Sequence, residues 1–332
     1  MANLKVNTVS GIGTEGTVFD GGLKFRSLNY LTLPKGDTTQ RGRGRGLIAG
    51  GATPVVAEIE YIEIQSQGTS ITFGNLSETR FGIGGCASAT RGLFGGGAEP
   101  TVRDYIEFVT IASTGNVTDF GDITVARRDL GSLSNQTRGI WCGGRTPSNS
   151  DVIDYVTIAT AGNAVDFGNL VAAANEGTCG TASPTRGIMA GGSSVNTIQY
   201  ITIATTGDAS DFGDLTRSAT SLSGAASATR SVFANGGTNT IDYITIATTG
   251  DATDFGDTTV VRGQSGGVSN SIRGVFTGGY QPSPTSSDTN VIDFIEFATT
   301  GNAKDFGDIN RSANDSNREH GTCSDSHGGL SE

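Results

Sequence analysis

The sequence predicts an all-β protein, a β-propeller of six four-stranded blades, and three observations lead to this prediction. Two short motifs recur six times, each repeat contains signals for four short strands, and the C-terminal segment resembles the first strand of a further repeat. A propeller blade is a four-stranded sheet, and known blade repeats run about 40 to 50 residues. A ring of such blades therefore accounts for the repeat length.

The first motif is an arginine followed by small and apolar residues and a Gly-Gly pair. It begins at Arg45, Arg91, Arg138, Arg186, Arg230 and Arg273. The second motif has a Phe-Gly core, which falls at Phe73, Phe120, Phe167, Phe212, Phe255 and Phe306. Six copies of a two-part motif at near-constant spacing indicate six structural units.

The elements of one unit follow from residue chemistry. Residues 186–190 form a short apolar strand, and the β-branched and aromatic residues 200–204 predict the next one. A tight turn at 206–208 leads to a partner strand at 211–213, because glycine supplies the positive φ of such turns. The small residues 224–229 suit a crowded inner strand of the following unit.

The two ends of the chain predict how the ring closes. Residues 321–328 resemble residues 84–92, the start of the second unit, whereas the unit at Arg45 lacks such a strand. We expect the C-terminal strand to complete the first blade, which also protects open sheet edges.

Residues 1–40 lie outside the six units, and we expect them to form an N-terminal arm or anchor beside a propeller of residues 41–332. The aromatic residues Phe19, Phe25 and Tyr30 need a partner surface and are predicted contacts. Residues 30–37 echo the third-strand motif with one residue deleted, so a seven-bladed ring is the alternative.

Composition excludes several classes of function. The net charge of −11 argues against binding to a phosphate backbone, so the RGRGRG run at 41–46 does not predict nucleic-acid binding. No apolar run reaches membrane-spanning length, and we expect no membrane insertion. Four scattered cysteines do not form a disulfide framework, which fits assembly in a reducing host cytoplasm.

The repeated polar motifs predict structural roles. Asp-Phe-Gly occurs without a kinase catalytic loop, so we expect the Phe to pack between blades and the Asp to cap a turn. The repeated arginines either line an anion channel or, as we favour, pair with carboxylates such as Asp119 or Asp211 and lock adjacent blades.

No catalytic, cofactor-binding or metal site is predicted. His320 points away from Cys323 and His327 on a strand, and zinc would want further ligands. No pair of acids stands out from the repeated ones, so we expect that the chain is not an enzyme.

The chain resembles kelch-type propeller repeats, in the glycine-rich version found in structural proteins of tailed phages of marine cyanobacteria. The Gly-Gly strands match the kelch diglycine, and an aromatic residue occupies the kelch tyrosine position, although Phe stands in for the downstream Trp. That aromatic is found at Tyr61, Phe108, Tyr155, Tyr200, Tyr243 and Phe294. The opening 22 residues also look like the start of virion proteins from such phages.

The resemblance implies a virion protein, either a capsid decoration or a tail or fibre component, whose partners are other virion proteins. The largest insertion, residues 280–288, predicts partner contacts at Tyr280, Gln281 and Asp288. A carbohydrate-binding adhesin that recognises a host-surface glycan is the alternative. The single Trp141 lies in an apolar strand and is expected in the core, which weakens that alternative.

Overall fold

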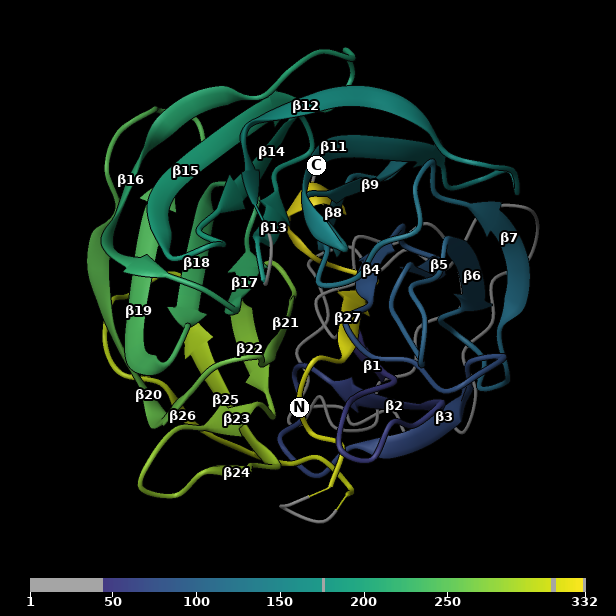
Figure 1. Ribbon diagram of the computed structural model, residues 1–332. Coiled ribbons are helices and arrows are strands. Elements are labelled where there is room, and N and C mark those ends of the chain that lie inside the picture. The colour runs from purple at the N-terminus through teal and green to yellow at the C-terminus, as the bar shows by residue number, and fades with distance from the viewer. Residues whose placement is uncertain (1–43, 175–176, 312–314, 331–332) are drawn as a thin grey trace, which may run out of the picture. The chain divides into compact units, whose positions relative to one another are not determined.

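The computed structural model describes residues 44–174, 177–311 and 315–330, which form one six-bladed β-propeller (Figure 1). Each blade is an antiparallel sheet, and in blades 2 to 6 the four main strands run in chain order from the axis outward, whereas blade 1 begins with the C-terminal strand. The predicted fold class and the six blades are therefore confirmed. Phe19, Phe25 and Tyr30 lie outside the described residues.

From the axis outward, the strands of the first three blades are as follows. Blade 1 has β27 (Gly321–Ser324), β1 (Arg45–Ala49), β2 (Glu58–Glu63) and β3 (Ile71–Asn75). Blade 2 has β4 (Gly84–Ala87), β5 (Arg91–Gly95), β6 (Tyr105–Thr110) and β7 (Thr118–Asp122). Blade 3 has β8 (Gly131–Ser134), β9 (Arg138–Cys142), β11 (Ser148–Thr157) and β12 (Val165–Ala174), with the short β10 (Arg145–Thr146) beside β11.

The other three blades repeat this plan. Blade 4 has β13 (Cys179–Ala182), β14 (Arg186–Ala190), β15 (Val195–Thr202) and β16 (Ser210–Ala219). Blade 5 has β17 (Leu222–Ala226), β18 (Arg230–Asn235), β19 (Thr238–Thr245) and β20 (Thr253–Arg262). Blade 6 has β21 (Gly266–Ser269), β22 (Arg273–Thr277), β25 (Val291–Glu296) and β26 (Lys304–Asp308), with a hairpin of β23 (Tyr280–Gln281) and β24 (Ser287–Asp288).

The ring closes through the C-terminal strand, as predicted. In blade 1, β27 pairs antiparallel with β1 and places Cys323 opposite Leu47. The amide of Arg45 donates to Asp325 Oδ1 at 2.8 Å, which joins the two described ends of the chain. In Figure 1 the yellow strand β27 lies between the axis and the purple strand β1. Separating the two ends would thus remove the innermost strand of a blade.

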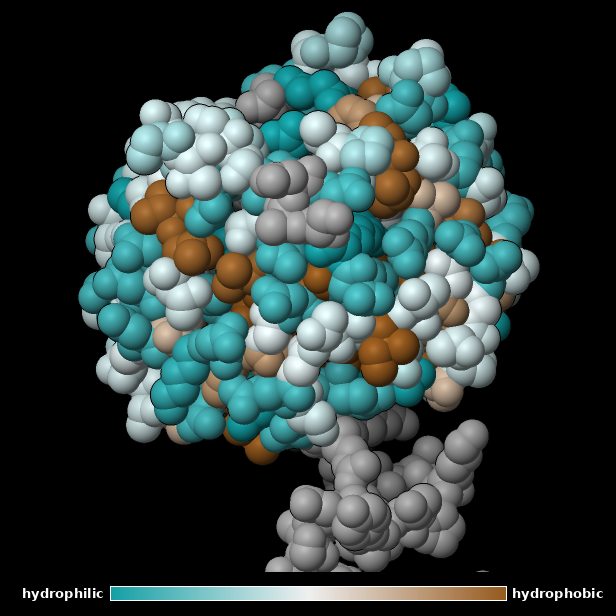
Figure 2. Space-filling view, turned by 90° about the horizontal axis from the view of Figure 1, so that it is seen from below, coloured by the Kyte–Doolittle hydropathy of each residue, from teal (hydrophilic) through white to brown (hydrophobic). Residues whose placement is uncertain are grey.

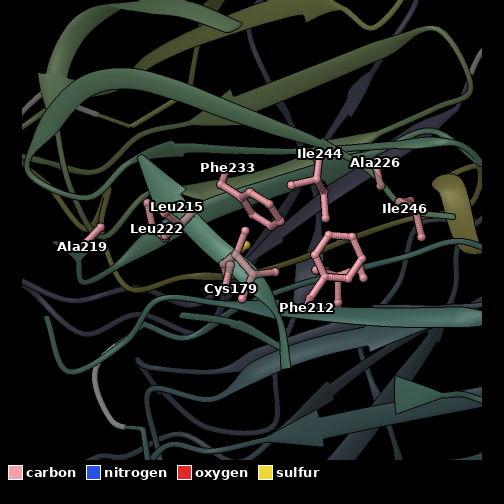
Figure 3. Close-up of a cluster of buried hydrophobic side chains, with 12 residues drawn as sticks. Cys179, Phe212, Leu215, Ala219, Leu222, Ala226, Phe233, Ile244 and Ile246 are labelled. Carbon is pink, nitrogen blue, oxygen red and sulfur yellow. The ribbon is translucent and has the colours of Figure 1, made fainter. Parts of the chain in front are cut away.

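The hydrophobic core is divided into clusters between neighbouring blades. Figure 3 shows one such cluster, in which Phe212 of blade 4 faces Phe233 and Ile244 of blade 5. The Phe of every Phe-Gly motif is buried and meets the third-strand aromatic of its own blade edge to face, with ring centroids 5.7 to 6.2 Å apart. The predicted packing of these phenylalanines is confirmed.

The glycine of the Phe-Gly motif lets the next blade approach. At Gly213, φ is +148°, and a Cβ there would lie 2.5 Å from the carbonyl of Gly250 in the next blade. The amide of Gly250 in turn donates to Phe212 O at 2.8 Å. The same close approach joins Gly74 to Gly115, Gly121 to Gly162, Gly168 to Gly207, Gly256 to Gly301 and Gly307 to Gly68. A side chain on the glycine of the Phe-Gly motif would push two blades apart, whereas the turn glycine of the next blade has open space at its Cβ position.

The aspartate before the Phe does not cap a turn, contrary to prediction. Asp211 lies exposed within β16. The hydrogen bond to this region is accepted by the residue after the turn glycine of the next blade. In blade 5 this residue is Asp251, whose Oδ1 accepts the amide of Asp214 in blade 4 at 3.0 Å. The exposed Asp can therefore be replaced without loss of the contact between neighbouring blades, which we call the joint. Blade 1 has Thr72 at this position.

The repeated arginines lock adjacent blades, but their partners differ from those expected. Arg186 lies over the ring of Tyr200, 4.5 Å from its centroid, and donates to the carbonyl of Ile246 in the next blade at 2.8 Å. All six arginines stack in this way, and their acceptors in the next blade are carbonyls of Ile111, Ile158, Ile203, Ile246, Phe297 and Ile64. The expected pairing with Asp119 or Asp211 is wrong, because both are exposed on outer strands. Within the described residues, Arg45 alone of the six has a carboxylate partner, Glu63 of its own blade at 2.8 Å.

A second set of arginines forms buried ion pairs at the joints. Arg262 follows the outer strand of blade 5 and approaches Asp293 of blade 6 at 3.0 Å, with both side chains fully buried. Burial lowers the pKa of Arg262, and the negative charge of Asp293 opposes this shift. At four other joints the arginine and the acid at the equivalent positions are Arg80 and Glu107, Arg127 and Asp154, Arg217 and Asp242, and Arg311 and Glu60.

The joint between blades 3 and 4 shows what these pairs require. The segment 171–185, which leads into blade 4, contains no arginine, and the equivalent of the buried acid is Gln199. The Oε1 of Gln199 accepts the amide of Val171 at 2.6 Å. Where the cation is missing the buried anion is replaced by a neutral amide, as the cost of an unpaired buried charge demands.

The first prediction concerns this charge balance. Arg262→Met leaves Asp293 buried without its cation, and we expect a loss of about 3 to 5 kcal/mol in the free energy of unfolding. The double variant Arg262→Met/Asp293→Asn copies the neutral joint at Gln199 and should recover more than half of that loss. Urea denaturation of the full chain measures both, and a double variant no more stable than the single one would contradict the argument.

The second prediction separates backbone strain from blade contact. Gly250→Ala places a side chain at φ +152° with no atom within 4 Å of the new Cβ, so it carries strain alone, about 1 to 3 kcal/mol. Gly213→Ala adds the collision with the next blade and should lower the melting temperature further. Equal melting temperatures for the two variants, measured by circular dichroism, would show that the close approach is not limiting.

Two histidines flank the closing strand, His320 buried and His327 partly buried. His327 Nδ1 accepts the amide of Gly329 at 3.1 Å, which leaves Nε2 to donate to Ala87 O at 3.0 Å. His320 Nε2 lies 2.9 Å from Thr277 Oγ1. Burial lowers the pKa of His327 from 6.5 to about 4 and that of His320 to about 3. Both imidazoles are therefore neutral at pH 7.

The third prediction follows from these pKa values. Between pH 6.5 and 4 the unfolded chain binds a proton at His327 that the folded chain does not, so the free energy of unfolding falls as the pH falls. His327→Gln should remove part of this pH dependence. The change in the free energy of unfolding that it removes over the interval is at most about 3 kcal/mol, because His327 keeps some exposed surface. Urea denaturation at a series of pH values compares the variant with the parent chain, and parallel curves would contradict the prediction.

Candidate functional site

The inner strands enclose a pocket on the propeller axis. The strands β27, β4, β8, β13, β17 and β21 each pair on one side only, so their other edges face the axis. The pocket between them has a volume of about 190 Å³. Its walls are mostly glycine, alanine, serine, threonine and cysteine, because only small side chains fit where six strands converge.

Hydroxyl groups tie several inner strands together. Ser324 Oγ donates to Ser269 O at 2.7 Å, and Ser269 Oγ donates to Ala226 O at 2.9 Å. Ser134 Oγ bonds Ala87 O in the same way at 2.8 Å. These side chains satisfy strand edges that would otherwise lack partners.

One end of the pocket is covered by the C-terminal turn η1 (Gly328–Leu330). A Cβ on Gly329 would lie 2.0 Å from Ser134 O, and one on Gly328 would lie 2.2 Å from Ser227 O. The side chain of His327 also lines the pocket and contacts Ala87 and Ser134. Small residues let the turn lie directly on the strand ends, so the pocket is closed here.

The other end is surrounded by six equivalent residues, one before each inner strand, which we call the collar. All six have a left-handed backbone, with φ between +54° and +78°. They are Gly82, Asp129, Gly177, Ser221, Gln264 and Glu319. Amide-to-carbonyl hydrogen bonds run round the collar from Asp129 to Gly82, Gly82 to Glu319, Glu319 to Gln264 and Gln264 to Ser221.

Polar side chains of the collar surround the pocket mouth. Gln264 Nε2 donates to Glu319 Oε1 at 2.6 Å, and Arg145 Nε lies 3.0 Å from Asp129 Oδ2. Burial and the nearby charge of Asp129 raise the pKa of Glu319. Left-handed backbone costs a non-glycine residue about 1 to 2 kcal/mol, so four such residues at one mouth mark a candidate functional site.

The predicted contact hairpin is attached beside this mouth. Tyr280 pairs with Asp288 across the hairpin, and its carbonyl accepts the amide of Gly263, next to the collar residue Gln264. Arg318 lies over the Tyr280 ring at 4.9 Å and 3.5 Å from Asp288 Oδ1. Asp288 is buried and Tyr280 and Gln281 are partly buried, whereas residues 283–286 are exposed at the tip.

Exposed apolar side chains also gather at this end of the blades. The loops between second and third strands and the connections between blades both lie at the mouth end, because successive strands run in opposite directions. The large apolar residues exposed there are Tyr105, Val125, Val171, Val195 and Val261. On the edge of the propeller in Figure 2, hydrophobic residues form small separate patches.

Other candidate residues from the sequence have structural surroundings. Trp141 is fully buried, as predicted, and its Nε1 donates to Gly84 O at 3.0 Å. His320 and His327 bond different blades. Within the described part of the chain, no group of three His, Cys, Asp or Glu residues is placed to hold a metal ion.

The sequence analysis missed the collar and the buried ion pairs. The collar has five different residue types at six positions, so no motif marks it. The ion pairs did leave a signal, because an acid precedes the third-strand aromatic in every repeat except the one with Gln199.

Comparison with known proteins adds no assignment. In the described residues, no helix is long and apolar enough to cross a membrane. No protein-family model matches the sequence, and no curated protein matches it significantly.

Proposed function

We propose that the chain is a non-enzymatic structural or interaction protein of a phage virion, a capsid decoration or a tail or fibre component that presents a rigid propeller to a partner. The observation that carries this proposal is the repetition of one set of joints round the ring. The stacked arginines and the Phe-Gly contacts occur between every pair of neighbouring blades, and a buried ion pair occurs at four of the six joints.

The two ends of the propeller differ in what they present. The end opposite the mouth has short turns of similar sequence in each blade, such as 206–208. The mouth end has the longer and more varied loops, the hairpin β23–β24 and the exposed valines. The loops of the mouth end differ more from blade to blade, so we assign the partner contact to this end.

Within the hairpin, the residues take different parts. Arg318 holds Asp288 and Tyr280, so these two side chains fix the hairpin in place, and Gln281 extends it toward the exposed tip at 283–286. The N-terminal arm of residues 1–40 is the proposed anchor to the particle, through Phe19, Phe25 and Tyr30.

The fourth prediction tests the anchor and the contact separately. Deletion of residues 1–40 should leave a folded propeller that no longer joins virions, whereas replacement of residues 283–286 by Asn-Gly should leave a chain that joins virions but loses its partner. Mass spectrometry of purified virions and circular dichroism give the readouts. Absence of the full chain from virions would overturn the proposal, and normal incorporation of the deletion variant would overturn the anchor.

A carbohydrate-binding adhesin is the second candidate, and the polar axial pocket is the observation that favours it. Sugar sites usually stack a ring on an exposed aromatic side chain, and Trp141 is buried. A glycan array separates the candidates, because a purely structural propeller binds none of the glycans.

A further inference from the structure

We propose that the axial pocket is a binding site for one small, uncharged, polyhydroxylated molecule, a monosaccharide or sugar alcohol, that passes through the collar. The proposal concerns the propeller axis and does not rest on a virion role or on the hairpin. It is argued from the size of the pocket, the chemistry of its wall and the arrangement of its two ends.

The pocket has room for a small solute. Its volume of about 190 Å³ corresponds to about six water molecules at ~30 Å³ each. Typical sites for drug-sized ligands start at about 300 Å³. With η1 and His327 across one end, a molecule can enter only past the collar. These dimensions favour a ligand of one ring or a short chain.

The hydrogen bonds along the wall differ from blade to blade. In blades 1, 3 and 6 the inner strands carry serine or threonine, and these hydroxyls bond the edge of the preceding inner strand, as Thr322 Oγ1 bonds Gly267 O at 2.9 Å. The inner strands of blades 2, 4 and 5 have only glycine and alanine at the equivalent positions, which are Gly85, Ala87, Gly180, Ala182, Gly224 and Ala226. No neighbouring hydroxyl therefore reaches the edges of β27, β8 and β13.

Those three edges are the recognition surface of the pocket. A strand edge presents N–H donors and C=O acceptors in alternation. A hydroxyl group can both donate and accept, so it can bond either kind of group. A molecule with several hydroxyls matches such an edge better than an apolar molecule does.

The charges in and around the pocket favour a neutral ligand. His320 and His327 are neutral at pH 7, and the other residues below the collar carry no charge. At the collar, Asp129 lies beside Arg145. Burial of an ion in such a pocket would have no compensating charge and would be costly.

The collar provides the means to test the site. Gln264 and Ser221 have nearly the same left-handed φ, +57° and +55°, at equivalent positions. Ser221→Gln therefore copies a residue that the fold already accepts and narrows the mouth. Val261→Gln is the matched control, because it adds the same side chain at an exposed position outside the collar.

The fifth prediction is a binding experiment on the full chain. Glycerol, myo-inositol and glucose are titrated by ligand-observed NMR, with glucosamine and gluconate as charged probes. We expect at least one neutral probe to bind, at least tenfold more tightly than either charged probe. Ser221→Gln should weaken this binding at least tenfold, and Val261→Gln should preserve it, with unchanged melting temperatures for both.

The contrary outcomes are equally definite. Failure of all three neutral probes to bind would overturn the proposal, and so would equal binding of the charged probes. Binding that survives Ser221→Gln but is lost on replacement of residues 283–286 would place a sugar site on the hairpin instead. None of these outcomes affects the virion proposal, which the fourth prediction tests.

Discussion

The fold depends on the close backbone approach between the outer strand of each blade and a turn of the next. At this contact two glycines meet, the one after the Phe has no room for a Cβ, and an amide of the second blade donates to the carbonyl of the Phe in the first. Because the contact is made by backbone atoms, its geometry is the same at every joint. A ring closes only if its joints rotate each blade by a consistent angle, so this uniformity is what lets the C-terminal strand return to β1.

The charged residues of the joints follow from the same need for uniform closure. The stacked arginines reach carbonyls, which every residue provides, so these contacts survive sequence drift between repeats. The buried ion pairs require two matching side chains, and the joint at Gln199 shows both partners changed together. The chain thus preserves the neutrality of the buried joint rather than any particular residue, as the energetics of buried charge predict.

The sequence was sufficient to predict the blade count, the strand order and the closing strand, because these depend on repeated hydrophobic strands and on glycine. It was not sufficient for the partners of Arg186 and its equivalents, since a backbone acceptor leaves no mark in the sequence. The burial of Asp288 also escaped prediction, because its partner Arg318 is distant along the chain. The collar is defined by backbone conformation at residues of different types, and no residue pattern encodes it.

Six similar blades would by themselves produce a six-fold symmetric axis, and the way this symmetry fails is informative. The contacts between outer strands of neighbouring blades are nearly identical round the ring. The differences between inner strands at the axis therefore do not reflect a general divergence of the six repeats. They are concentrated at the axis, where hydroxyls seal some strand edges and glycine and alanine leave others open. The C-terminal turn closes one end, and four strained non-glycine residues surround the other. Concentration of such strain at one mouth is consistent with our proposal that the mouth selects what enters the axis.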